Sequence, residues 1–360
     1  MEIDALRSLS SGPALDIISA VLHRTKQGDK AMPSHDPASR RRTLLALGIG
    51  AAIAPFASSA AVEPYPSRPI KLVVPFPPGS GTDIAARHFA RLVGELAGQP
   101  AIVENKPGGN GFIAVQAVLN APADGYTVLL GSNSTLSTNA AAFRKPPYDP
   151  VADFSPISLL VGAPVMVVVP PGSRYKTLAD LVADAKQRPG ALNYGTGSIS
   201  YTLYAEWMNQ LAGIKTTPIN YKGSGDAGAA AMAGNVDFSI VDASSSVELV
   251  KSGRLRGLLL AAPHRSPLLP EVPSAVDAGL GAFDAFTWVG AAVSAKTPAH
   301  ISRRLAQLFT SAGNSDETRR FYEGQLVSMR LSTPEEMRRY QIEEIARWKS
   351  LMRLTGLELQ

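Results

Sequence analysis

The sequence predicts an α/β protein made of two lobes, each a mostly parallel β-sheet flanked by helices. Three observations support this fold class. The chain has 360 residues, which is enough for two domains of ordinary size. From residue 70 onward, short apolar runs alternate with helical patterns, as in a doubly wound parallel sheet. A long β-rich run, Leu159–Pro170, then precedes a second series of the same kind, so we expect a second lobe.

The elements of the first lobe are separated by turns rich in Gly, Pro and Asn. The clearest of these turns are Asn105–Gly111 and Pro122–Gly125. We expect strands at Ile70–Pro75, Ala101–Glu104 and Tyr126–Leu130, and helices at Gly81–Ala97 and Gly111–Leu119.

The second series repeats the pattern and includes a Thr/Ser/Gly loop at Gly195–Ser200. We expect helices at Leu178–Gln187, Tyr201–Ala212, Tyr221–Met232 and Val247–Ser252, and strands at Leu192–Tyr194, Thr217–Asn220, Val236–Val241 and Leu255–Ala262. A β-rich run, Phe286–Val293, would return the chain to the first lobe.

Two amphipathic helices, Pro298–Ala312 and Thr333–Leu354, are expected to finish the chain. Helical spacing predicts that apolar residues of the last one pack in the core or between the lobes: Met337, Tyr340, Ile342, Ile345, Trp348, Leu351 and Met352. We divide the chain into a leader (1–61), the first part of lobe 1 (62–165), lobe 2 (166–287) and a return to lobe 1 with the C-terminal helices (288–360).

The first 61 residues have the organisation of an export signal. Basic residues Arg40–Arg42 precede a short apolar run, Leu44–Phe56, and small residues follow. The run is too short and too rich in Gly and Ala for a membrane span. The arginines resemble a twin-arginine signal, although the general secretory route is not separated from it. We expect cleavage after Ala60 or Ala61.

The segment before Met32 does not fit a signal, because it is long and contains acidic residues. We hypothesise that translation starts at Met32; the alternative is a genuine extended leader.

Composition excludes several classes of function. The chain has no cysteine, which excludes disulfides, thiolate metal sites and a cysteine nucleophile. After Ala61 the only histidines are His88, His264 and His300, far apart in sequence, so we expect no metal site. Lys+Arg (35) only slightly exceed Asp+Glu (30), and no basic cluster with aromatics indicates nucleic-acid binding. We expect no cofactor, and we expect His88 to be a packed or exposed helical residue.

The stretch Leu72–Ala86 is a strand, a Pro/Gly-rich turn and the start of a helix. The first N–H groups of a helix lack intrahelical partners and lie at the positive end of its dipole. Gly79 and Gly81 let the backbone approach a ligand, and Thr82 and Asp83 are residue types found at N-caps. The stretch therefore predicts a site for a small anion such as a carboxylate. The alternative is an ordinary strand-to-helix turn that binds nothing.

Ser132–Thr135 is a second candidate, directly after the third predicted strand. In open α/β sheets, ligands bind at the carboxyl ends of the strands. These residues would then contact the ligand; the alternative is a set of caps and turn residues.

Gly79-Ser80-Gly81 is not a dinucleotide fingerprint, since Ile84 takes the place of the third glycine, and no Walker or G-x-S-x-G motif occurs. An acid pair, Asp83 and Asp242, is conceivable, but we expect Asp83 to cap the helix and Asp242 to shape the pocket or orient water.

Seven ordered motifs resemble those of one family. They are YPSRPIKLVVPFPPGSGTD, VENKPGGNG, ADGYTVLLGSNST, YDPVADFSPIS, LNYGTGS, YKGSGDA and RSPLLPEVPSAVDAGL. Together they resemble the periplasmic receptors of tripartite tricarboxylate transporters, also called Bug receptors, over nearly all of the chain from Tyr65 onward. The resemblance implies a two-lobed "Venus flytrap" that is not an enzyme. It also implies a monomer that grips a small organic acid in its cleft and docks to membrane permease subunits or a sensor kinase.

The resemblance also implies that loop amides and bridging waters hold one ligand carboxylate. In the first lobe the contacts would be Phe76, Pro78, Gly79, Ser80, Gly81, Thr82, Asp83, Ser132, Asn133, Ser134 and Thr135. In the second lobe they would be Thr196, Gly197, Ser198, Ser200, Tyr201, Thr202, Asp242 and Ala243, with Trp288 near the crossing between the lobes. Lys222–Ser224 match a motif that supports the pocket.

Two positions depart from the family pattern. Ala243 stands where Asn is common, and Tyr201-Thr202 stands where a Ser-His pair is usual, in a shorter loop. We hypothesise that these changes suit a larger or aromatic carboxylate. The rival function is an exported α/β hydrolase or transferase that uses the same cleft, but no convincing nucleophile and base accompany it. A scaffold that binds nothing is the third possibility.

Overall fold

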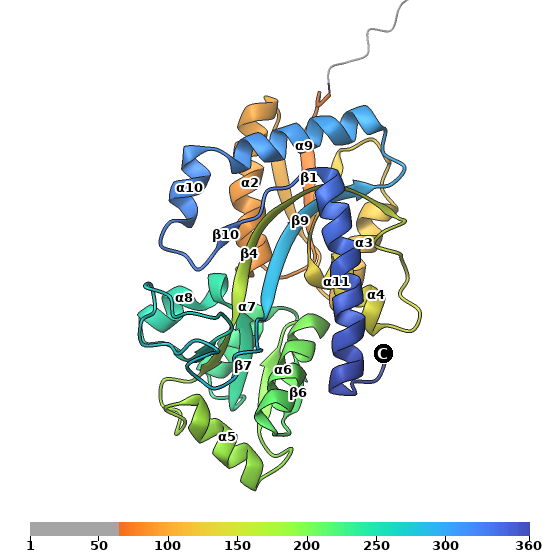
Figure 1. The fold of residues 1–360 in the computed structure, drawn as a ribbon. Helices are drawn as coiled ribbons and strands as arrows, with labels where there is room; N and C mark the ends of the chain where they lie inside the picture. Colours follow the sequence, from red (N-terminus) through yellow and green to blue (C-terminus); the bar gives the residue numbers. More distant parts are fainter. Residues whose placement is uncertain (1–64) are drawn as a thin grey trace, which may run out of the picture. The chain divides into compact units, whose positions relative to one another are not determined.

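The structure is a computed structural model that describes residues 65–360 (Figure 1). The predicted export signal, its cleavage after Ala60 or Ala61 and the start at Met32 lie outside these residues. Within residues 65–360, no helix combines the length and apolar character that a membrane span requires.

The first sheet has three parallel strands next to two antiparallel ones. Its order is β2-β1-β3-β9-β4, and a short strand, β10, pairs with β4. The strands are β1 (Ile70–Val74), β2 (Ala101–Asn105), β3 (Thr127–Ser132), β4 (Phe154–Val169), β9 (Phe286–Ser294) and β10 (Ser328–Met329). The helices of this lobe include α2 (Gly81–Ala97), α3 (Phe112–Leu119), α9 (Ala299–Gly313) and α10 (Asp316–Tyr322). The apolar face of α2, including Phe89 and Val93, packs against Leu72 and Val74 of β1.

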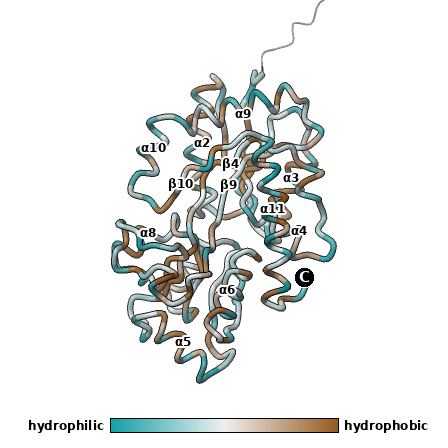
Figure 2. Tube along the Cα trace, in the orientation of Figure 1, coloured by the Kyte–Doolittle hydropathy of each residue, from teal (hydrophilic) through white to brown (hydrophobic). Residues whose placement is uncertain are grey.

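The second sheet continues from the far half of β4. Residues Val165–Val168 of β4 pair antiparallel with β7, and β7 is followed by β5 and β6 in parallel. β8 also pairs with this half of β4. The strands are β5 (Asn193–Thr196), β6 (Thr217–Asn220), β7 (Phe238–Asp242) and β8 (Arg256–Leu260), and the helices are α5 (Leu178–Gln187), α6 (Ile199–Ala212), α7 (Ser224–Met232) and α8 (Ala243–Lys251). Hydrophobic residues gather along the inner strands, and the outer loops are mostly hydrophilic (Figure 2).

Two long strands carry the chain between the lobes. β4 and β9 pair antiparallel from Phe154 opposite Ser294 to Pro164 opposite Phe286. Beyond this point β4 pairs with β7 instead. The β-rich runs predicted to cross between lobes therefore are strands, and both sheets meet where the chain crosses.

The last helix, α11 (Pro334–Thr355), runs along both lobes (Figure 1). Met337 packs near Trp288 in the first lobe, whereas the ring of Trp348 lies 5.0 Å from that of Tyr204 on α6. The prediction that Ile342 packs is wrong, because its side chain is 52% exposed. Gln341 is buried instead, where its amide donates to the carbonyl of Leu136 at 2.7 Å.

Several element boundaries differ from those expected. α8 begins at Ala243 rather than Val247, because Asp242 is its N-cap and accepts from the N–H of Ser245. β5 extends through Thr196 and α6 starts at Ile199, which shortens the expected loop. The π-helical turn η2 (Ser134–Thr138), α4 (Asn139–Ala142) and α10 were not expected, because their polar, short segments carry little periodic apolar signal.

Candidate functional site

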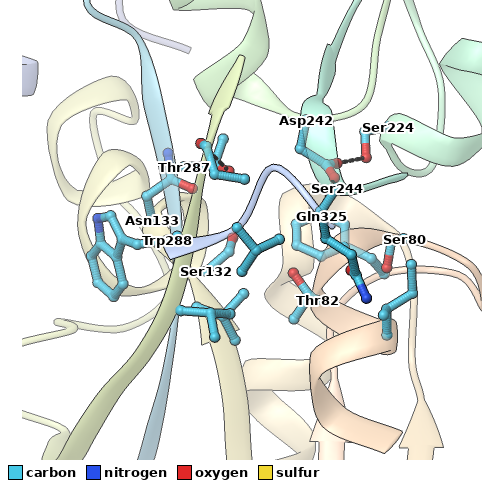
Figure 3. Close-up of a pocket in the computed structure, with 18 of the residues that line it drawn as sticks. Ser80, Thr82, Ser132, Asn133, Ser224, Asp242, Ser244, Thr287, Trp288 and Gln325 are labelled. Carbon is cyan, nitrogen blue, oxygen red and sulfur yellow. Dashed lines mark hydrogen bonds between the residues drawn. The ribbon is translucent and has the colours of Figure 1, made fainter. Parts of the chain in front are cut away.

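The carboxyl ends of the strands in the two sheets face each other across a small cavity, which we call the inner cavity. Its volume is about 40 Å³. First-lobe and second-lobe side chains point toward one another across it (Figure 3). Its lining includes Phe76, Ser80, Gly81, Thr82, Ile84, Ser132, Asn133, Tyr201, Ser224, Asp242, Ser244, Thr287, Trp288, Tyr322, Gln325 and Val327.

The start of α2 is capped by Ser80, not by Thr82 or Asp83. The Ser80 hydroxyl accepts from the N–H of Asp83 at 3.3 Å. The Asp83 carboxylate instead accepts from the N–H of Gly79 (2.9 Å) and from the side chains of Arg87 (3.0 Å) and Asn105 (2.8 Å). Burial opposes ionisation of Asp83, but these hydrogen bonds outweigh it and lower its pKa. Asp83 therefore fixes the turn and does not line the inner cavity.

Because Ser80 serves only the N–H of Asp83, the N–H groups of Gly81 and Thr82 keep no intrahelical partner. Both residues line the inner cavity. They lie at the positive end of a 17-residue helix. This corner of the cavity can bind an anion without a basic side chain.

Asn133 adds a second donor from the end of β3. Its side chain is only 3% exposed, and the side-chain Nδ2 group has no hydrogen-bond partner within the described chain. The neighbouring Ser132 hydroxyl, by contrast, accepts from the N–H of Ser134 at 3.2 Å and lies 2.8 Å from the hydroxyl of Ser134. A buried amide without a partner is costly, so the Asn133 amide is suited to an acceptor from a ligand.

Asp242 forms the opposite wall, at the end of β7. Its carboxylate accepts four hydrogen bonds, from the Tyr201 hydroxyl (3.2 Å), the Ser224 hydroxyl, the Ser244 hydroxyl (2.5 Å) and the N–H of Ser245 (2.8 Å). Burial and the adjacent Asp242 charge raise the pKa of Tyr201 well above its usual value, so its phenol stays protonated and donates. Asp242 is therefore a buried, fully hydrogen-bonded carboxylate.

The two walls approach each other closely. A Cβ placed on Gly81 would lie 2.5 Å from the Ser244 hydroxyl oxygen and 2.6 Å from an Asp242 oxygen. A Cβ on Gly223 would lie 2.8 Å from Pro77 of the first lobe. Glycine at these positions allows the lobes to come together with the α2 N-terminus beside Asp242.

A second, larger cavity, which we call the outer cavity, has a volume of about 590 Å³ and shares only Phe76 with the inner one. Gly197, Ser198 and Thr202 line it, together with Lys222. Beside it the N–H of Ile199 donates to the Asn110 side chain at 3.0 Å, which joins the lobes.

The structure thus divides the predicted site residues into three groups. Nine line the inner cavity: Phe76, Ser80, Gly81, Thr82, Ser132, Asn133, Tyr201, Asp242 and Trp288. Phe76, Gly197, Ser198 and Thr202 line the outer cavity. Neither cavity is lined by Pro78, Gly79, Asp83, Ser134, Thr135, Thr196, Ser200 or Ala243.

Among the polar residues that line the inner cavity, sequence reasoning did not single out four: Ser244, Thr287, Tyr322 and Gln325. Ser244 follows the predicted Asp242–Ala243 turn directly, so a longer window would have included it. Tyr322 and Gln325 come from the region of α10, far along the chain, and no local signal could have found them.

Two observations concern which chemical groups the site could use: the contacts of His88 and the residue types that line the inner cavity. The His88 ring is stacked on Phe321, and its Nε2 lies 2.8 Å from the Thr318 hydroxyl oxygen. Burial lowers its pKa. Among the described residues that line the inner cavity, none is His, Lys or Arg. Within residues 65–360, no group of three or more His, Asp or Glu is arranged to hold a metal.

Comparisons with known proteins agree with this architecture. The family described as "Tripartite tricarboxylate transporter family receptor" matches residues 85–357. Protein BugT of Bordetella pertussis is 32% identical over 322 residues, covering 89% of this chain and 99% of that protein.

Two solved structures are also similar. An R. palustris protein solved with adipate is 30% identical with a TM-score of 0.77, covering 81% of this chain and 98% of that one. MatC from Rhodopseudomonas palustris, solved with bound malate, is 28% identical with a TM-score of 0.75, covering 80% and 99%. The expected two-lobed α/β periplasmic-binding-protein fold is confirmed.

Proposed function

Because this chain belongs to the tripartite tricarboxylate transporter receptor family, we propose that it captures a small organic carboxylate between its lobes and delivers it to a membrane permease or a sensor. The family consists of non-enzymatic periplasmic binding proteins. Two relatives were solved with adipate and with malate, which supports a carboxylate as ligand. The rival expectation of a hydrolase or transferase does not agree with this family.

The observation that carries the proposal is the side-chain amide of Asn133, which is buried and without a partner on a residue that lines the inner cavity. The N–H groups of Gly81 and Thr82 supply further donors from the same lobe. A carboxylate can accept several hydrogen bonds at once, and bonds to a charged group are stronger than neutral ones. Its binding would satisfy the Asn133 amide and use the α2 dipole.

Ligand entry would require the lobes to separate. A volume of about 40 Å³ is far below that of a cavity that holds benzene, roughly 150 Å³. The lobes would rotate about the point between Pro164 and Val165, where β4 changes its partner from β9 to β7. It also supports the proposed lobe limits near residues 165 and 287.

Ala243 and Tyr201, which depart from the family pattern, give little support to the hypothesis of a larger or aromatic ligand. Ala243 lines neither cavity, so it does not enlarge the site. The Tyr201 hydroxyl is used by Asp242. We further propose that the protein works as a monomer after export, with cleavage near Ala61 by the twin-arginine or the general secretory route.

A thermal-shift screen with matched pairs of organic acids and their neutral amides tests the proposed function. We expect at least one acid to raise the melting temperature while its amide does not, and NMR to recover that acid unchanged. Equal stabilisation by acids and amides, no stabilisation by any acid, or turnover of the bound acid would each contradict the proposal.

A further inference from the structure

Tyr322, the last residue of α10, carries a buried hydroxyl that no group of the described chain uses. Tyr322 is 6% exposed and lines the inner cavity, and its hydroxyl has no hydrogen-bond partner within residues 65–360. A buried polar group without a partner is costly. Burial also raises the pKa of the phenol, so the hydroxyl stays protonated and can donate. This donor is therefore available to an acceptor from outside the described chain.

The other polar side chain that the same segment brings to the inner cavity is already used within the protein. The Gln325 side-chain amide donates to the carbonyl of Phe321. The N–H of Gln325 donates to the carbonyl of Tyr322 at 3.1 Å, which keeps these two residues close together. The apolar residue Val327 completes the contribution of the segment to the cavity lining. The Tyr322 hydroxyl is thus the polar group that this segment leaves for a ligand.

Asn133 and the segment that carries Tyr322 lie on opposite sides of the inner cavity. The first sheet places β3, β9, β4 and β10 next to one another, through the paired residues Ser132, Val289, Val161 and Met329. The first three of these residues line the cavity. Neighbouring strands lie about 4.8 Å apart, so β3 and β10 are separated by roughly 14 Å. Asn133 follows β3 and Gln325 precedes β10, and Figure 3 shows their side chains on opposite sides of the cavity.

The segment between α10 and β10 also contacts the second lobe. It belongs to the first lobe, because β10 pairs with the first half of β4. Leu326 nevertheless packs against a core cluster of the second lobe. The Lys251 side chain on α8 donates to the carbonyl of Gly324 at 3.2 Å. The segment therefore lies where the two lobes meet, and these contacts hold Tyr322 beside the cavity.

Building on the proposed function, we infer that Tyr322 is a ligand-binding residue that determines specificity. Its hydroxyl donates to an oxygen of the bound acid that is remote from the carboxylate bound by Asn133. The preferred ligand therefore carries a second oxygen, in a hydroxyl, carbonyl or carboxylate group, several bonds away from the first carboxylate.

Isothermal titration calorimetry on the wild type and Tyr322→Phe tests this inference with matched acids. The sets are butanoate, 4-hydroxybutanoate and succinate; hexanoate, 6-hydroxyhexanoate and adipate; and benzoate, 4-hydroxybenzoate and terephthalate. In at least one set, we expect the wild type to bind an acid with the second oxygen about tenfold or more tightly than the plain acid. Tyr322→Phe should lose about tenfold in affinity for that acid and less than about twofold for the plain one.

Tyr65→Phe is the matched control. The Tyr65 hydroxyl donates to the carbonyl of Gly125 at 2.7 Å, and Tyr65 lines neither cavity. Urea unfolding without ligand should give a lower midpoint for Tyr65→Phe, because this variant loses a hydrogen bond within the protein. The midpoint of Tyr322→Phe should be unchanged or higher, because its hydroxyl has no partner to lose. Tyr65→Phe should bind every acid as the wild type does.

The outcomes separate this inference from the proposed function. If Tyr322→Phe loses the same affinity for acids with and without the second oxygen, or binds all of them as the wild type does, the inference is wrong and the carboxylate receptor stands. A lower urea midpoint together with wild-type affinities would assign the Tyr322 hydroxyl to folding instead. If no acid of any set binds to the wild type, both the inference and the proposed function are contradicted.

Discussion

The two strand-to-helix turns that face each other across the inner cavity use similar residues in opposite ways. In the first lobe a serine, Ser80, caps the helix and the acid Asp83 turns away to Arg87. In the second lobe the acid Asp242 caps the helix and faces the cavity. Both turns leave the first two N–H groups of their helix without intrahelical partners, but only the second places a carboxylate beside the cavity. The comparison teaches that the choice of capping residue decides whether the positive end of a helix faces a cavity alone or together with a carboxylate.

The most disruptive change should be at the point of contact between the two turns. Gly81→Ala would place a Cβ against Ser244 and Asp242, whose hydrogen bonds leave them little freedom to move. Overpacking costs about 1–3 kcal/mol, so we expect affinity for the ligand to fall by about 100-fold in titration calorimetry. Gly228→Ala is the control, because its Cβ would meet Val241 at an ordinary 3.8 Å. Equal effects of the two variants would mean that the contact does not matter for binding.

The second-largest loss of affinity should follow from removing a hydrogen-bond donor from the first-lobe wall of the inner cavity. Asn133→Leu removes the buried amide that has no partner in the described chain. Hydrogen bonds to charged groups contribute about 1.5–3 kcal/mol, so affinity should fall by at least tenfold with little loss of stability. Asn235→Leu, at an exposed turn, controls for the substitution. Unchanged affinity for Asn133→Leu would remove this residue from the site.

A smaller effect, on the free energy of unfolding, should come from Asp83, whose side chain turns away from the inner cavity. Asp83→Asn should lower the free energy of unfolding by about 1–2 kcal/mol at pH 7, since its hydrogen bonds to Gly79 and Arg87 favour the charged form. The pKa of Asp83 is lower in the folded state, so its contribution is present above the unfolded pKa of about 3.9 and is lost as pH falls through the folded value.

Urea unfolding at several pH values measures this contribution. The difference between the wild type and Asp83→Asn should shrink below about pH 4. Glu343→Gln, on an exposed position of α11, is the control. A difference that stays constant across this range would show that the charge of Asp83 does not stabilise the turn.

The smallest effect on binding should come from the other glycine of the first turn. Gly79 has a φ of 84° and no atom within 4 Å of the position of a Cβ. Gly79→Ala should therefore strain the backbone by about 1 kcal/mol while changing affinity less than threefold. Calorimetry and urea unfolding measure the two effects. A loss of affinity as large as that of Gly81→Ala would show that the whole turn, and not only its contact with Asp242, forms the site.

The sequence predicted regular elements well where local signals were strong. The limits of α2 are those expected, because an apolar strand, a Pro/Gly turn and a helical pattern follow one another without interruption. The start of α8 was missed because three serines follow Ala243 and resemble a loop. α10 was missed because its burial depends on contacts with α2, such as Thr318 with His88.

The site was predictable only in part, for a similar reason. Strand ends indicated Ser80, Asn133 and Asp242, since ligands of open α/β sheets bind there. The division into inner and outer cavities depends on how closely two lobes approach at Gly81 and Phe76, which no local pattern encodes. The direction of the Asp83 side chain depends on Asn105, which belongs to a different strand.

The helix α11 limits how the cleft can work. Met337, in the first turns of α11, packs in the core of the first lobe. Trp348 and Met352, in its last turns, pack in the core of the second lobe. The helix is therefore packed into one lobe at each end. If the lobes separate as proposed, the second lobe must either lose the contact between Trp348 and Tyr204 or bend α11, so α11 would limit how far the lobes can move apart. The separation of the lobes would therefore be limited by the packing of α11 as well as by contacts to the ligand.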